Sequence, residues 1–145
     1  MDLTLKQANI IIEHALAKGH ESHCKPLTVV VLDTGGQFKA LAREDGSGIL
    51  RVEIATGKAW GALGIGLGSR ALAKRIQEDP LGAAFVDAIA TASGGKVVPV
   101  PGGVLVRDDA GALIGAVGIS GDTSDNDEAC AVAGVQSAGL TADTG

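Results

Sequence analysis

Aromatic residues are almost missing from this sequence of 145 residues, which has one tryptophan, two phenylalanines and no tyrosine. Proteins that bind single-stranded nucleic acid stack its bases on several aromatic side chains, and few are present here. Basic residues are also in the minority, with 12 lysines and arginines against 17 aspartates and glutamates. Because nucleic-acid binders carry a basic surface, nucleic acid is not expected as a partner.

Long hydrophobic runs are missing as well, because charged residues such as Lys58, Arg70 and Asp87 interrupt the apolar stretches. A membrane-spanning helix needs roughly 18 or more consecutive apolar residues, so no membrane association is expected. The first residues lack the basic segment followed by an apolar segment that marks a secretory signal. We therefore expect a cytoplasmic protein in which Cys24 and Cys130 are reduced.

Glycine and small or aliphatic residues are abundant instead. Hydrophobic residues make up 46% of the sequence and 22 residues are glycine, about twice the average share of glycine. The glycines are scattered through apolar runs, which indicates tight turns and close backbone approaches rather than disorder. The length predicts one domain over residues 1–145, with a core of Val, Ile, Leu and Ala.

An amphipathic helix is predicted from Thr4 to about His20, with Thr4 as N-cap and Gln7 completing a capping box. Helical spacing places five residues on its expected core face: Leu5, Ala8, Ile12, Ala15 and Leu16. His14 falls on nearly the opposite side, beside Ile10. The helix therefore has a second, mixed face that is open to solvent or to a partner.

Two β-hairpins are predicted, each with a turn that begins with aspartate and contains glycine. Their strands are residues 27–32 with 37–43, and residues 104–107 with 112–119. A fifth strand is predicted at residues 96–100. The segment 27–32 is apolar without alternation, as expected of a strand that is covered on both faces.

Three short helices are predicted between the hairpins, at residues 49–67, 69–77 and 81–92, and a last helix at 124–139 with Ser124 as its N-cap. Glycines weaken the first of the three by up to about 1 kcal/mol each relative to alanine. Only close packing against another element can offset that cost. The order α-ββ-ααα-βββ-α predicts an α+β fold, with about five antiparallel strands and helices on both faces of the sheet.

Candidate catalytic residues lie on the glycine-rich helix and near the first hairpin. Arg51 and Lys58 share one stripe of the helix among small neighbours. Two such cations can hold a carboxylate, and a desolvated lysine has a lowered pKa suited to acid–base chemistry. The alternative is a pair of long side chains at a helix edge with their charges in water. Asp33 and Asp45 flank the hairpin as turn residues or as a possible base.

The segment Gly19-His20-Glu21-Ser22-His23-Cys24 is rich in side chains that bind metals. Structural zinc takes four ligands, mostly nitrogen and sulfur, and this segment offers at most three of these. A surface junction between helix and strand is the favoured interpretation, with His20 and His23 kept as candidate metal ligands.

The acidic segment 122–128 resembles a calcium loop only superficially, because it lacks the glycine and the final glutamate of an EF-hand. Its acidic residues are better interpreted as capping the last helix and complementing its dipole.

Five segments stand out as a set: Val31-Leu32-Asp33-Thr34-Gly35-Gly36, Arg43-Glu44-Asp45-Gly46, Ile54-Ala55-Thr56-Gly57-Lys58-Ala59, Gly102-Gly103-Val104 and Gly115-Ala116-Val117-Gly118-Ile119-Ser120-Gly121. In this order and spacing they resemble the GlcG/HbpS-like haem-binding family, from Leu5 to about Leu140. The resemblance implies an antiparallel five-stranded sheet flanked by helices, and assembly of the chain with itself into tetramers or octamers.

The resemblance also implies a cofactor, because some members of that family bind haem, in at least one branch through a histidine of the first helix. His14 is the corresponding candidate here, and a neutral imidazole is a common axial ligand of haem iron. His20 and His23 are candidates for a second haem contact. The alternative for His14 is an exposed surface histidine.

The expected function is therefore an oligomeric haem- or tetrapyrrole-binding protein with a sensing, storage or accessory role. A second hypothesis is a small-molecule enzyme or accessory factor of a catabolic operon, with a small acidic metabolite held by Arg51 and Lys58. A third is an assembly protein without a ligand, since glycine and alanine on helix faces favour close packing.

Overall fold

The computed structural model describes residues 2–145, which form five helices and one antiparallel sheet of five strands. In chain order the elements are α1 (Leu5–Glu21), β1 (Thr28–Leu32), β2 (Phe38–Arg43), α2 (Arg51–Ile65), α3 (Arg70–Glu78), α4 (Pro80–Ala92), β3 (Gly103–Arg107), β4 (Leu113–Ser120), α5 (Ser124–Ser137) and β5 (Thr141–Asp143). The strands are arranged in the order β2-β1-β4-β3-β5. None of the helices within residues 2–145 is both long and apolar enough to cross a membrane.

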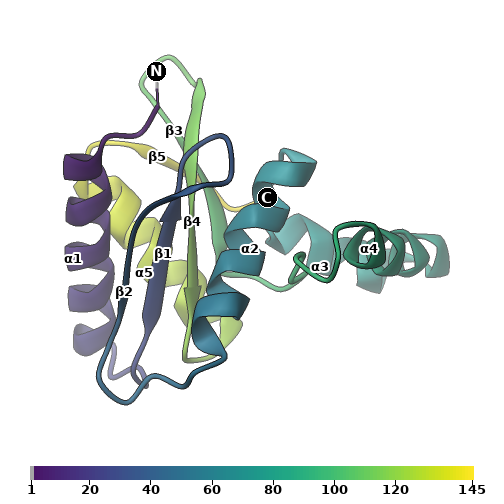
Figure 1. Ribbon diagram of the computed structural model, residues 1–145, viewed down its shortest axis with the longest axis horizontal. Helices are drawn as coiled ribbons and strands as arrows, with labels where there is room; N and C mark the ends of the chain where they lie inside the picture. Colours follow the sequence, from purple (N-terminus) through teal and green to yellow (C-terminus); the bar gives the residue numbers. More distant parts are fainter. Residues whose placement is uncertain (1) are drawn as a thin grey trace.

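Helices cover both faces of the sheet, which confirms the predicted α+β fold. α1 and α5 lie side by side on one face, and α2 lies on the other (Figure 1). α3 and α4 pack against each other and extend away from the sheet as an arm (Figure 1). β1 is buried along its whole length, as its apolar sequence predicts.

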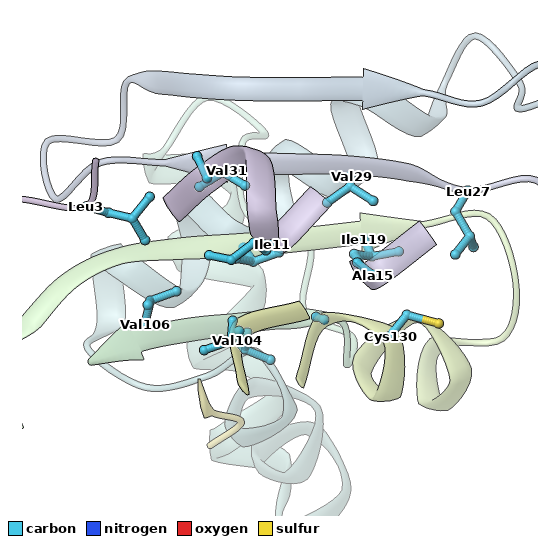
Figure 2. Close-up of a cluster of buried hydrophobic side chains, with 14 of the residues drawn as sticks. Leu3, Ile11, Ala15, Leu27, Val29, Val31, Val104, Val106, Ile119 and Cys130 are labelled. Atoms are coloured by element: carbon cyan, nitrogen blue, oxygen red, sulfur yellow. The ribbon is translucent and has the colours of Figure 1, made fainter. Parts of the chain in front are cut away.

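The main core lies between the sheet and the α1–α5 layer. Figure 2 shows valines and isoleucines of β1, β3 and β4 gathered against small residues of the two helices. Alternate residues of the same strands, such as Val30 and Leu32 of β1, face α2 on the other side and pack against its alanines. The period of two along each strand thus divides the apolar residues between two cores.

α1 begins as predicted and buries most of the expected face, because Ala8 and Ala15 lie in the core while Ile12 and Leu16 pack against it partly buried. The Thr4 hydroxyl accepts a hydrogen bond from the Gln7 N–H at 3.1 Å, and the Gln7 side chain accepts one from the Thr4 N–H at 2.9 Å, so the capping box is complete. Leu5 was expected in the core and is 55% exposed, whereas Ile11 is fully buried. The reason is α5, whose Gly134 lies against the backbone of Ile11 and turns that side of α1 inward.

The fifth strand was predicted in the wrong place. Residues 96–100 form no strand, and β5 at the other edge of β3 completes the sheet. Val97 instead belongs to the small core under the α3–α4 arm, and the Val98 N–H donates to the Gly57 carbonyl of α2 at 3.2 Å. Pro99 and Pro101 have no N–H to donate to a neighbouring strand, so the segment cannot continue as part of a ladder.

The start of the last helix also differs from the prediction. Thr123, not Ser124, is the N-cap of α5, because its extended backbone lets the hydroxyl accept a hydrogen bond from the Asn126 N–H at 3.3 Å. The three middle helices lie within about two residues of their predicted bounds.

The glycines of α2 fall into two kinds. A side chain at Gly57 would place its Cβ 2.5 Å from the Lys96 carbonyl oxygen, and one at Gly61 would come within 3.0 Å of Val97. These two glycines let the segment 96–98 approach the helix closely. This is the close packing that was expected to offset the cost of glycine in a helix. Gly66 ends the helix with a positive φ of 79°, which favours glycine. Gly64 faces open space.

Two substitutions in α2 should therefore have opposite effects on stability. Gly57→Ala is expected to lower the free energy of unfolding by about 1–3 kcal/mol, because it overpacks the contact with Lys96. Gly64→Ala should raise it by up to about 1 kcal/mol, because alanine is the better helix former and meets no atom. Urea unfolding followed by circular dichroism measures both, and equal changes in the two variants would contradict this packing.

Candidate functional site

His14 lies on the outer face of α1 and its side chain is exposed. Its imidazole forms no hydrogen bond or ion pair with any of residues 2–145. Ile10, which is half-buried, and Ala17, which is exposed, lie within one turn of His14. Lys18 is also within one turn, and its Nζ is 3.5 Å from the Glu21 carboxylate. This face offers one free nitrogen ligand, an apolar border and a cation.

The other two histidines lie at the junction of α1 and β1. Nε2 of His20 is 2.8 Å from Oε2 of Glu44, whose other oxygen accepts a hydrogen bond from the Leu27 N–H at 2.7 Å. His23 is exposed, with a left-handed φ of 56°. Within residues 2–145, no group of three or more His, Cys, Asp or Glu side chains is placed to hold a metal ion. The histidines are therefore not assembled into one set of metal ligands.

Lys58 is the largest fully buried side chain, with 2% exposure. Its Nζ donates to the Ile119 carbonyl at 2.8 Å and to Oδ2 of Asp127 at 3.1 Å. Burial lowers the pKa of Lys58, and the neighbouring Asp127 carboxylate opposes that effect. The alternative that Lys58 lies at a helix edge with its charge in water is wrong, because its ammonium group is buried and donates to two protein oxygens.

Asp127 is the residue of this network that the sequence interpretation missed. It is 1% exposed, and its second oxygen accepts a hydrogen bond from the Asp122 N–H at 3.0 Å. The sequence does carry a signal for it: Asp127 stands at helical spacing before Cys130 and Ala131, which are buried residues of α5. A carboxylate on an apolar stripe requires a partner cation in the interior.

Arg51 reaches the same end of β4 as Lys58. Its Nη1 donates to Oγ of Ser120 at 3.0 Å, next to the Ile119 carbonyl that Lys58 uses. The shared stripe of α2 thus brings the two cations to successive residues of one strand, as the helical spacing predicts.

The two aspartates near the first hairpin are far apart along β2. Oδ1 of Asp33 accepts hydrogen bonds from the N–H groups of Gly35 and Gln37, each at 3.0 Å, and so shapes the β1–β2 turn. Asp45 is exposed in the turn that follows β2. The antiparallel register places these turns at opposite ends of the β1–β2 pair, so the structure does not bring the two carboxylates together.

A groove of about 420 Å³ lies on the α2 side of the molecule, between α2, the end of the β1–β2 turn and residues 94–96. We call it the Trp60 groove, and its lining includes Phe38, Glu53, Gly57, Trp60 and Lys96. The Lys96 ammonium lies over the Trp60 ring, 5.2 Å from its centroid. The sequence interpretation did not single out these residues. A signal for the groove was available in the composition. Aromatic residues are scarce, and two of the three, Phe38 and Trp60, lie together here.

Comparisons with known proteins identify a family and a fold. The family described as "Haem degrading protein HbpS-like" matches residues 3–136. No curated protein gives a significant match. Among solved structures, HbpS is 26% identical over 94% of this chain and 89% of its own, with a TM-score of 0.77.

Two further structures share the fold at lower identity. A PduOC:haem complex is 24% identical and covers 99% of both chains, with a TM-score of 0.85. Protein ORFY of Klebsiella pneumoniae is 22% identical over 94% of this chain and 90% of its own, with a TM-score of 0.83.

The buried ion pair predicts a specific pattern of stabilities. Asp127→Ala should lower the free energy of unfolding by about 3–5 kcal/mol, because it leaves the Lys58 ammonium buried without its counter-charge. The double variant Lys58→Met with Asp127→Leu should recover most of that loss. Asp125→Ala removes an exposed partner of Arg70 from the same turn of α5, and should cost at most about 1 kcal/mol. Urea unfolding tests the set, and a double variant no more stable than Asp127→Ala would contradict the interpretation.

Proposed function

The chain belongs to the HbpS-like family of haem degrading proteins, and on that basis we propose that it binds haem on the outer face of α1, with His14 as an axial ligand of the iron. Two of the similar structures are those of HbpS and of a PduOC:haem complex. The haem complex supports a haem ligand for this chain, and the proposal adds a sensing, storage or accessory role.

The free imidazole of His14 is the observation that carries the choice of ligand. An axial ligand must be reachable by the porphyrin and must have a nitrogen that no protein group already occupies. His14 meets both conditions with either ring nitrogen, whereas Glu44 already holds Nε2 of His20 and leaves only Nδ1. His23 is exposed, but it lies outside the helix in the α1–β1 junction.

The surroundings of His14 fit one side of a haem group. Ile10 and Ala17 border the imidazole with apolar surface, and Lys18 provides a positive charge within reach of a propionate. The acidic Glu21 on this face is paired with Lys18. When bound, haem would supply the redox and gas-binding chemistry of its iron, while these residues position it.

A single α1 face leaves the second side of the porphyrin in water, so the proposal includes a second copy of the chain. Ile10 and Ala17 give the His14 face of α1 an apolar surface that is open to solvent. Such a surface supports self-association. Haem would then lie where the first helices of two copies meet.

Haem titration followed at the Soret band tests the ligand. Wild-type protein should bind haem saturably. His14→Ala should raise Kd by roughly tenfold or more, since even outer-shell partners of metal ligands are worth about 10–100-fold in affinity. The double variant His20→Ala with His23→Ala is the matched control and should bind like wild type. Loss of binding in the control alone would move the ligand to the α1–β1 junction, and weak, unsaturable binding in all three proteins would reject the proposal.

Light scattering at micromolar concentration tests the assembly. The expected result is a homo-oligomer with an even number of chains, because the proposed site pairs two α1 faces. A monomer both with and without haem would show that the second side of the porphyrin is not covered by another copy.

A further inference from the structure

We propose that the Trp60 groove is a second binding site, separate from the haem face, which takes a small planar aromatic monocarboxylate. The inference does not rest on haem binding. It draws on the position of the groove, the aromatic residues in its walls, its charges and its glycines.

The groove and His14 lie on opposite sides of the sheet. α1 carries His14 on one face, while the groove is formed by α2, the β1–β2 turn and the segment after α4 (Figure 1). No histidine lines the groove, so it has no imidazole for haem iron. A volume of about 420 Å³ is near the lower end for ligand pockets, and suits a single ring rather than a porphyrin.

The aromatic lining points to a flat apolar ligand. This chain has only three aromatic residues, and two of them, Phe38 and Trp60, line this groove. Phe38 is 55% exposed, which leaves an apolar ring surface in contact with water. A ligand ring placed against these side chains removes that surface from water and gains offset or edge-to-face aromatic contacts.

The charges in the groove specify the polar groups of the ligand. The Lys96 ammonium is held over the Trp60 ring by a cation–π interaction, and forms no ion pair with residues 2–145. It is therefore free to receive one carboxylate. Glu53 also lines the groove and has no cationic partner within residues 2–145. Its carboxylate repels a second acid group and accepts a hydrogen bond from a donor such as a ring hydroxyl.

Glycines give the groove walls on which a ring can lie flat. Gly94 and Gly95 have positive φ values of 73° and 81° and face open space. Gly36 approaches Trp60 so closely that a Cβ there would lie 3.1 Å from two indole atoms. Bare backbone at these positions keeps the groove open beside the indole.

This site gives the acidic-metabolite hypothesis a different cation from the one the sequence suggested. The Lys58 ammonium is satisfied by Asp127 and the Ile119 carbonyl, whereas Lys96 has a charge without an acidic partner in the described chain. A small aromatic acid thus has one clear point of attachment.

Intrinsic fluorescence is a direct test, because Trp60 is the only tryptophan and the chain has no tyrosine. The probe is para-hydroxybenzoate, compared with terephthalate, which carries a second acid group, and with cyclohexanecarboxylate, which is not planar. The expected result is saturable quenching by para-hydroxybenzoate, with at least about tenfold weaker binding of the other two. No saturable change, or equal binding of the three, would overturn the proposal.

Variants separate this site from general charge effects and from haem binding. Lys96→Met should weaken para-hydroxybenzoate binding about tenfold or more, because it removes a charge-assisted hydrogen bond. The matched control Lys74→Met removes an exposed lysine of α3 that lies outside the groove, and should bind like wild type. Equal weakening in both lysine variants would reject the assignment, and thermal unfolding verifies that each is folded.

His14→Ala should leave para-hydroxybenzoate binding unchanged, whether or not that variant loses haem. Haem added to saturation should not displace the probe from wild-type protein. If His14→Ala abolishes the binding of both ligands, or if haem competes with the probe, the groove is not a separate site.

Discussion

The buried ion pair between Lys58 and Asp127 is the constraint on which the arrangement of the three layers depends. Lys58 comes from α2 on one side of the sheet, and Asp127 comes from the first turn of α5, which packs on the other side. Between them, the Lys58 ammonium also binds the Ile119 carbonyl at the end of β4. One charge therefore connects both helical layers and the strand between them. A buried charge tolerates little displacement from its partners, so this interaction fixes the register of α2 and α5 on the sheet.

The Lys58–Asp127 pair lies inside the molecule, and the outer faces of α1 and α2 carry different sets of side chains. The α1 face has a free imidazole, a cation and no large aromatic side chain, and suits a metal-containing ring that is held mainly by its iron. The α2 face has two aromatic rings and a cation but no imidazole, and suits an organic acid. The sheet and its two cores separate these faces, so the two proposed ligands would share no contacting residue.

The sequence predicts those parts of the molecule that depend on local patterns. The capping box at Thr4, the two hairpin turns and the wholly buried β1 follow from residue types at fixed spacing. The misplaced fifth strand shows the limit, because residues 96–100 have strand-like composition but pack against glycines of α2 that are about forty residues away. The role of Asp127 was missed for a similar reason, since a carboxylate in the first turn of a helix suits a cap equally well. The groove depends on three distant segments coming together, which no local pattern encodes.

The strand order has a consequence for how the chain reaches this structure. β1 pairs with β2, and β3 with β4, through short connections, but the pairing of β1 with β4 joins Thr28 to Ser120. The centre of the sheet therefore closes around a loop that contains α2, α3 and α4. Pairings between residues so far apart in sequence are slow to form. We expect the two hairpins to be early local units and their docking to be the slow step. The charges of Lys58 and Asp127 would then stay hydrated until the last stage of folding.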